Sequence, residues 1–251
     1  PDTPTIATAS PARTSKLTPL KMVNSASPVV TCLPSPETLI MFCARAFNSL
    51  LWFVVACVLA LSAAAASAAT ILVHGDSLSS GYGLPQEQGW VSLLAQRLRA
   101  EKFNYKVANA SISGETTLGG ANRIEAALKE HRPAIMILAL GANDGLRGSS
   151  LDAMRANLET MVDACRRANA RVLLVGMRLP PNYGMPYAEK FQRVFGEIAR
   201  ARKVALVPFL LEGFAADREL FQEDGIHPTA AAQPLMLDTV WKGLRPLLKK
   251  Q

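Results

Sequence analysis

Two short motifs carry the side chains of a hydrolytic triad. The first, GDSL at residues 75–78, follows an apolar run and supplies a serine hydroxyl. The second, DGIHP at residues 224–228, supplies an imidazole with a carboxylate three residues before it. A serine hydroxyl is a weak nucleophile at neutral pH until a neighbouring base takes its proton, and such triads are recognised by geometry rather than chain order. We therefore predict acyl transfer with Ser77 as nucleophile, His227 as base and Asp224 as its orienting carboxylate. Taken alone, residues 224–228 are equally typical of a turn before a helix.

Acyl transfer also needs hydrogen-bond donors aimed at the oxyanion that develops on the substrate carbonyl. Gly114 suits this task because the backbone N–H of a glycine approaches a reacting centre without side-chain obstruction. Asn143 supplies an uncharged side-chain N–H, and the N–H of Ser77 is a third candidate. Singly, Gly114 is also typical of a turn, and Asn143 of a helix cap or loop. Together with the triad, these donors predict an oxyanion hole.

The other histidines and most cysteines fit structural roles. His74 stands at the end of an apolar run, where packing explains it, and His131 ends a helical pattern near the surface. Cys165 lies within another helical pattern and is expected to fill the core. The remaining cysteines fall in an N-terminal region that we expect to be removed, namely Cys32, Cys43 and Cys57. No internal disulfide is then expected.

From residue 70 onward, short apolar runs alternate with amphipathic stretches. This alternation is typical of a parallel sheet covered by helices on both faces, an α/β fold. The expected strands are residues 70–74, 105–109, 134–140, 172–177 and 205–208. The expected helices are residues 90–101, 118–131, 151–168, 187–202 and 229–248. We therefore predict one domain over residues 69–251.

Polar clusters follow the first three expected strands, at residues 75–77, 110–115 and 141–144. In open doubly wound sheets, ligands bind beyond the carboxyl ends of the strands, near the point where the strand order reverses. The three clusters should therefore meet at one edge. The same topology can return the loop before the last helix, with Asp224 and His227, to that edge.

At this point the residues resemble the SGNH (GDSL) hydrolases. Four sequence blocks match in order, at residues 75–78, at Gly114, at residues 141–144 and at residues 224–228. The chain is most similar to the periplasmic thioesterase, protease and lysophospholipase group of Gram-negative bacteria, also called arylesterases. This resemblance implies a flavodoxin-like three-layer sandwich, the triad and oxyanion roles given above, no metal and no cofactor. A monomer is the default that it implies.

The predicted substrate-binding residues come partly from this resemblance and partly from apolar character. The resemblance implies that residues 144–149 and 179–183 line an acyl-chain groove. The substrate-binding candidates are Asp76, Leu78, Asp144, Leu146, Leu179, Pro180 and Tyr183. Leu146, Leu179, Pro180, Pro181, Met185 and Phe209 could form an apolar trough, although core packing explains each of them singly.

The N-terminal part of the chain is not expected to belong to the folded domain. Residues 1–40 are rich in Pro, Ser and Thr, which predicts a disordered extension or a start site placed too early, with Met41 as the true start. Residues 41–68 have the basic, apolar and small-residue parts of a signal peptide, with cleavage after Ala66 or Ala68. An uncleaved anchor, or lipidation at Cys57, is the alternative. We therefore predict a periplasmic or secreted protein without a stable membrane span after processing.

The formal net charge is +7, yet the basic residues are scattered and are not interleaved with aromatics, so nucleic-acid binding has little support. The expected partner is a small ester or thioester with acyl or aryl groups. A carbohydrate O-deacetylase uses the same site residues and remains an alternative. A non-catalytic acyl-chain binding protein is a second alternative, although binding alone places no demand on a nucleophile and base.

Overall fold

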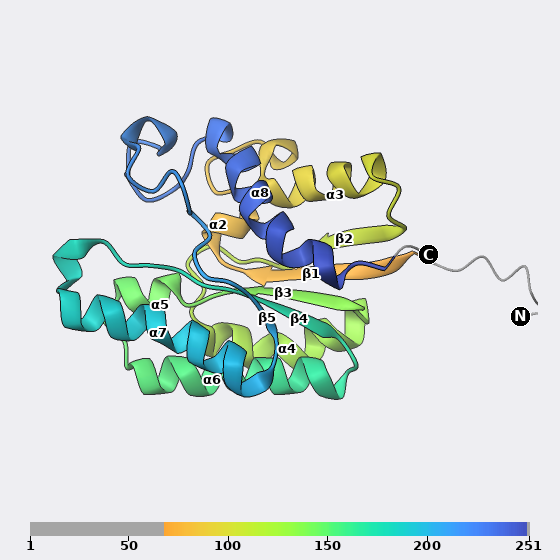
Figure 1. The fold of residues 1–251 in the computed structure, drawn as a ribbon, viewed down its shortest axis with the longest axis horizontal. Coiled ribbons are helices and arrows are strands. Elements are labelled where there is room, and N and C mark those ends of the chain that lie inside the picture. Colours follow the sequence, from red (N-terminus) through yellow and green to blue (C-terminus); the bar gives the residue numbers. More distant parts are fainter. Residues whose placement is uncertain (1–67, 250–251) are drawn as a thin grey trace, which may run out of the picture. The chain divides into compact units, whose positions relative to one another are not determined.

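The computed structural model describes residues 68–249, which form a parallel sheet between two layers of helices (Figure 1). The expectations for residues 1–40 and 41–67 lie outside the described residues. The strands are β1 (Ala69–Gly75), β2 (Tyr105–Asn109), β3 (Ile135–Ala139), β4 (Arg171–Val175) and β5 (Ala205–Val207). Their spatial order is β2-β1-β3-β4-β5, and every pair is parallel. The predicted α/β fold with a five-stranded parallel sheet is confirmed.

Burial of the strands follows their place in the sheet. β3 lies at the centre, and all five of its residues are buried, as expected for a strand covered by helices on both faces. β2 lies at an edge, and Tyr105 alone of its five residues is buried. The register of β1 with its two neighbours places Val73 beside Asn109 on one side and Ile137 on the other. The carboxyl ends of β1, β2 and β3 therefore lie side by side.

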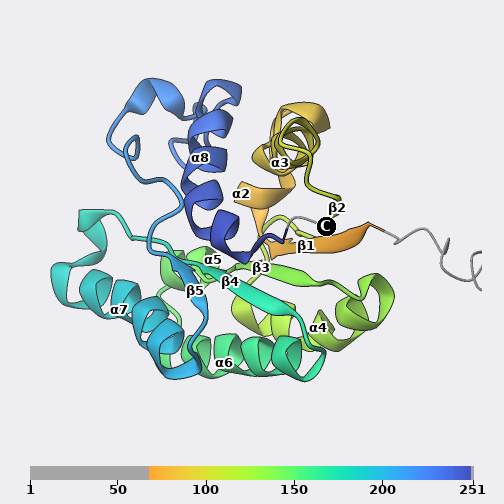
Figure 2. The same ribbon diagram turned by 45° about the vertical axis from the view of Figure 1, so that its right-hand side comes forward.

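Helices cover both faces of the sheet (Figure 2). One face carries α3 (Trp90–Ala100) and α8 (Gln233–Leu244), and the other carries α4 (Thr117–His131), α6 (Leu151–Arg167) and α7 (Met185–Arg202). Each layer has its own apolar core against the sheet, with Trp90 and Val240 on the first face and Leu158 and Phe195 on the second. Cys165 is fully buried in the second core, as expected. Among residues 68–249, no helix is long and apolar enough to cross a membrane.

Two short helices and the form of the last helix differ from expectation. The expected strands, and the first four expected helices, agree with the structure to within two residues at each end. However, α2 (Ser77–Ser80) and α5 (Ala142–Leu146) occupy segments that we expected to be loops. Residues 229–248 are not one helix, because 3₁₀ turns at Ala230–Ala232 and Arg245–Leu247 flank α8. Pro234 and Pro246 lack the N–H that a continuous helix needs, which explains both interruptions.

Gly176 and Gly196 offer a matched pair for testing the packing of the sheet. A Cβ on Gly176, directly after β4, would lie 2.6 Å from the backbone oxygen of Pro208, which cannot move independently of its strand. We expect Gly176→Ala to lower the free energy of unfolding by about 1–3 kcal/mol. In contrast, a Cβ on Gly196 within α7 would meet only the end of Arg200 at 3.4 Å. Gly196→Ala should be neutral or stabilising by up to about 1 kcal/mol, and urea unfolding of both variants checks the contrast. Equal losses would contradict it.

Candidate active site

Ser77 stands where β1 ends and α2 begins, at the carboxyl edge of the sheet. Asp76 caps this helix, because its Oδ1 accepts a hydrogen bond from the Leu78 N–H at 3.0 Å. Gly75 allows the tight turn, since a Cβ there would lie 2.8 Å from Ser79 Oγ. The helix ends after one turn at Gly81, whose φ of +77° lies in the left-handed region that favours glycine. The serine is therefore presented at a short helix N-terminus.

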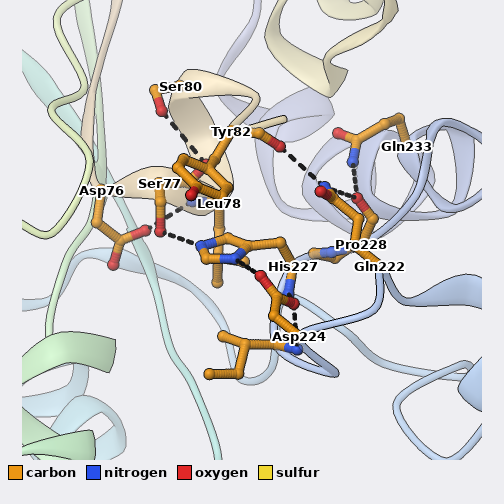
Figure 3. A network of polar contacts seen from close by, with 11 residues as sticks. Asp76, Ser77, Leu78, Ser80, Tyr82, Gln222, Asp224, His227, Pro228 and Gln233 are labelled. Carbon is orange, nitrogen blue, oxygen red and sulfur yellow. Dashed lines mark hydrogen bonds and ion pairs between the residues drawn. The ribbon is translucent and has the colours of Figure 1, made fainter. Parts of the chain in front are cut away.

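The structure brings the three triad residues together (Figure 3). His227 Nε2 lies 2.8 Å from Ser77 Oγ, and Nδ1 lies 2.6 Å from Asp224 Oδ2. Asp224 Oδ1 also accepts hydrogen bonds from the backbone N–H groups of Ile226 and His227, at 2.8 and 2.9 Å. The His227 N–H, then the imidazole and the Ile226 N–H, lower the pKa of Asp224 to about 2. The carboxylate therefore stays ionised at neutral pH and can orient the imidazole.

A short antiparallel contact fixes the backbone that carries His227. The Gln222 N–H donates to the carbonyl of His227 at 2.8 Å, and the Thr229 N–H donates to the carbonyl of Leu220 at 2.8 Å. The Gln222 side chain extends this contact, because its Nε2 donates to the carbonyl oxygens of Tyr82 and Pro228 at 2.9 and 3.2 Å. The Gln222 amide thus joins the loop that carries His227 to the turn after Ser77.

Gln233, at the start of α8, makes a second link and is buried. Its Oε1 accepts from the Trp90 N–H at 3.0 Å, and its Nε2 donates to the carbonyls of Pro228 and Thr229 at 3.4 and 3.3 Å. The indole N–H of Trp90 in turn donates to the carbonyl of Leu78 at 3.0 Å. Sequence reasoning missed both glutamines. The one available signal was a glutamine within the otherwise apolar start of the last helix.

The predicted oxyanion donors lie beside the nucleophile. Gly114 and Asn143 both line the cavity that contains Ser77. Gly114 has a φ of +77°, and its carbonyl accepts a hydrogen bond from Arg147 at 3.1 Å. Asn143 Nδ2 donates to the carbonyl of Glu115 at 3.0 Å. A side-chain amide has two N–H bonds, so this contact holds the amide in place and leaves a second donor for a ligand.

A cavity of about 720 Å³ extends from the triad. Five of the predicted substrate-binding residues line it, together with Phe209. These five are Asp76, Leu78, Leu146, Leu179 and Pro180. The structure places Asp144 and Tyr183 outside the lining, and Met185 is 61% exposed elsewhere.

Asp144 and Tyr183 instead make contacts that hold α5. The buried Asp144 carboxylate accepts from the backbone N–H and the hydroxyl of Thr117, at 2.8 and 2.6 Å. The Tyr183 hydroxyl donates to the carbonyl of Leu146 at 3.2 Å. Gly145 lets α5 pack closely, since a Cβ there would lie 2.7 Å from Phe191. These contacts fix the helix that presents Asn143.

Burial shifts the pKa of two side chains near the site in favour of their neutral forms, so that His74 is neutral at pH 7 and Asp76 is protonated below pH 7. His74 Nε2 donates a hydrogen bond to the Gly120 carbonyl, 3.1 Å away, and burial, followed by the charge of Arg123, lowers the pKa of His74 to about 4. This agrees with the packing role expected for His74. Burial also raises the pKa of Asp76 to about 7, against the opposing effect of the Leu78 N–H. Within residues 68–249, no group of three or more His, Cys, Asp or Glu side chains could hold a metal ion.

Comparison with known proteins identifies relatives that cover most of the described chain. Residues 73–234 match the sequence profile of the GDSL-like Lipase/Acylhydrolase family. The chain is 51% identical over 183 residues to Esterase TesA of Pseudomonas aeruginosa, covering 73% of this chain and 91% of that protein. It is 40% identical over 184 residues to Thioesterase 1/protease 1/lysophospholipase L1 of Escherichia coli, covering 73% and 87%. A crystal structure of TesA has a TM-score of 0.70 at 51% identity, covering 71% of this chain and 99% of that one.

The raised pKa of Asp76 predicts that the free energy of unfolding depends on pH. Because its pKa rises from 3.8 to about 7 on folding, the folded protein retains a proton that the unfolded chain releases. The contribution of this proton to the free energy of unfolding is fully present below about pH 4 and is lost as the pH rises through 7. The Asp76→Asn variant has no such proton and keeps an oxygen to cap α2. Between pH 4 and 8, the free energy of unfolding of the wild type should fall relative to Asp76→Asn by on the order of 3–4 kcal/mol. Chemical denaturation at several pH values measures this difference, and a constant or rising difference would contradict the assignment.

Proposed function

The chain belongs to the GDSL-like lipase/acylhydrolase family and hydrolyses esters, and on this basis we propose that Ser77, His227 and Asp224 perform the reaction through an acyl-serine intermediate. The observation that carries this proposal is the unbroken line of contacts from Asp224 through His227 to Ser77 Oγ. These contacts lie at the wall of a largely apolar cavity. A nucleophile, its base and an orienting carboxylate within hydrogen-bond reach are the geometry that acyl transfer requires.

Acylation begins when Ser77 Oγ attacks the carbonyl carbon of the ester. His227 Nε2, 2.8 Å away, takes the hydroxyl proton as the new C–O bond forms. The ionised Asp224 then faces the positively charged imidazolium and stabilises it. Asp224 also holds Nδ1 and the backbone of the same residue, so the ring keeps its orientation during the transfer.

The charge that develops on the carbonyl oxygen is received by N–H donors. We assign this role to the backbone N–H groups of Ser77 and Gly114 and to the Asn143 amide. The hydrogen bonds of Arg147 and Asn143 to the 114–115 segment support the assignment, because they hold the donors in place before substrate binds. Collapse of the tetrahedral intermediate releases the alcohol or thiol, which takes the proton from His227. Water, activated by the same imidazole, then hydrolyses the acyl-serine.

The lining of the cavity favours an acyl or aryl substrate over a carbohydrate acetate. Leu146, Leu179, Pro180 and Phe209 supply mostly apolar surface beyond the triad, which suits a hydrocarbon chain. Carboxylic esters, acyl thioesters and lysophospholipids all place such a chain beside a hydrolysable carbonyl. We therefore propose that the protein hydrolyses substrates of this class. We also propose that the reaction uses no cofactor and that the protein acts as a monomer.

Replacing the nucleophile tests the proposal directly. Ser77→Ala removes the attacking oxygen, so hydrolysis of p-nitrophenyl butyrate should fall by on the order of 10⁵- to 10⁶-fold. Covalent labelling by a fluorophosphonate probe should also be lost, because the probe reacts with an activated serine. Mass spectrometry of the labelled wild type should place the adduct on Ser77. Unchanged turnover in Ser77→Ala would refute the assignment.

Asn143→Ala is the matched control within the same site. It leaves the nucleophile and base intact, so the probe should still label Ser77. Hydrolysis should fall by only about 10²- to 10³-fold, because one oxyanion donor is lost. A non-catalytic acyl-chain binding protein would show neither labelling nor this graded loss.

We extend the proposal to the location of the enzyme. The signal-like segment at residues 41–68 supports export and cleavage, with the catalytic domain acting in the periplasm or outside the cell. Expression of the full chain in a Gram-negative host should yield a periplasmic protein that begins at Ser67 or Ala69. Intact-mass measurement on each cell fraction checks this result, and an uncut chain in the membrane fraction would contradict it.

A further inference from the structure

We propose that Tyr82 and Ile226 form the leaving-group side of the cavity, and that the ring of Tyr82 favours flat aromatic leaving groups there. The proposal rests on the assignment of His227 as the residue that protonates the leaving group. Both side chains line the cavity, and each is about half exposed, at 52% for Tyr82 and 48% for Ile226. When an apolar ligand covers apolar side chains that are exposed inside a cavity, the removal of their surface from water favours binding.

The ring of Tyr82 lies directly against the catalytic imidazole. The centroids of the Tyr82 and His227 rings are 4.4 Å apart, and the ring planes are inclined by 36° (Figure 3). The two nitrogens of the imidazole face Asp224 and Ser77. Tyr82 therefore occupies a face of the ring that the triad does not use. The residue comes from the turn after α2, whereas His227 comes from the loop before α8, so the contact joins both halves of the site.

Hydrogen bonds on both sides hold the backbone that carries the Tyr82 ring. Its N–H donates to the carbonyl of Ser77 at 3.2 Å, and its carbonyl accepts from Gln222 Nε2 at 2.9 Å. Gly81 and Gly83, on either side, have φ values of +77° and +73°, which turn the chain sharply around it. The ring thus projects from a held backbone and forms a wall beside His227.

The chemistry of the reaction determines which substituent of the ester meets this wall. When the tetrahedral intermediate collapses, the bond from the carbonyl carbon to the leaving oxygen breaks, and its electron pair stays on that oxygen. This oxygen takes the proton from His227 Nε2, while Ser77 Oγ remains bonded to the acyl carbon. The leaving oxygen must therefore lie within hydrogen-bond reach of Nε2. The group attached to it then lies on the side of the cavity that is lined by Tyr82, whose ring contacts the imidazole, and by Ile226, the residue before His227.

The chemical character of this wall selects the leaving group. Tyr82 offers a ring and Ile226 an aliphatic side chain, and neither has a charge. Aromatic pairs in offset or edge-to-face arrangements gain about threefold to tenfold in binding beyond the area that they bury. A phenolic leaving group can form such a pair with Tyr82, whereas an alkyl alcohol of similar acidity cannot. The acyl chain then lies on the α5 side of the cavity, near Leu146 and Leu179.

A pair of esters with one acyl group isolates this effect. Phenyl butyrate and hexafluoroisopropyl butyrate form the same butyryl-serine and release leaving groups of similar acidity, so the ratio of their kcat/KM values reports the leaving-group side alone. We expect Tyr82→Leu to lower the aryl-to-alkyl ratio about fivefold and Tyr82→Phe to preserve it. Ile226→Ala should lower the ratio about twofold. Leu235→Ala removes an exposed leucine on α8 outside the cavity and should leave both kcat/KM values unchanged.

The outcomes separate this proposal from the proposed function. An unchanged ratio in Tyr82→Leu would overturn the leaving-group assignment, and if both kcat/KM values fell by the same factor, Tyr82 would act only through His227. Since the ratio is taken within one variant, a partly misfolded Tyr82→Leu preparation lowers both rates and leaves the ratio valid. If Ser77→Ala retains turnover, the assignment of the nucleophile fails instead, whatever the ratio shows.

Discussion

The site depends on one long-range contact, between His227 Nε2 and Ser77 Oγ, which joins residues 150 positions apart in the sequence. A hydrogen bond of this kind forms only if the two backbones are already held at the right separation. Gln222 and Gln233 provide that separation, because their side-chain amides bind carbonyl oxygens of the base loop and groups on the nucleophile side. Side-chain amides suit this task since each both donates and accepts.

The sheet supplies the other half of the arrangement. β1 and β3 are neighbours at the point where the strand order reverses, and the segments after them carry Ser77 and Asn143. In such sheets the crevice beyond the carboxyl ends at the reversal is the usual ligand site. The base loop follows β5, the strand farthest from β2 in the sheet order, and returns over the face that α3 and α8 cover (Figure 1). The sheet thus brings Ser77 and Asn143 to one edge, whereas His227 reaches that edge through the backbone and side-chain contacts of its loop.

This difference explains what could be predicted from the sequence. Strand ends and polar clusters follow the hydrophobic pattern, so the strands and the neighbourhood of Ser77 and Asn143 were predicted correctly. α2 and α5 are single turns whose formation depends on the Asp76 cap and on the close packing of Gly145, and neither leaves a periodic signal. The roles of Tyr82 and Gln222 depend on tertiary contacts between segments more than a hundred residues apart, which no local pattern encodes.

The position of the base so late in the chain has a consequence for synthesis. A ribosome makes Ser77 and the oxyanion segments well before it makes His227, and the contacts of Gln233 need the start of α8 as well. A polypeptide that ends before residue 227 therefore has Ser77 without His227 beside it. Because it lacks the residue that we propose as the base, such a truncated product should not hydrolyse esters.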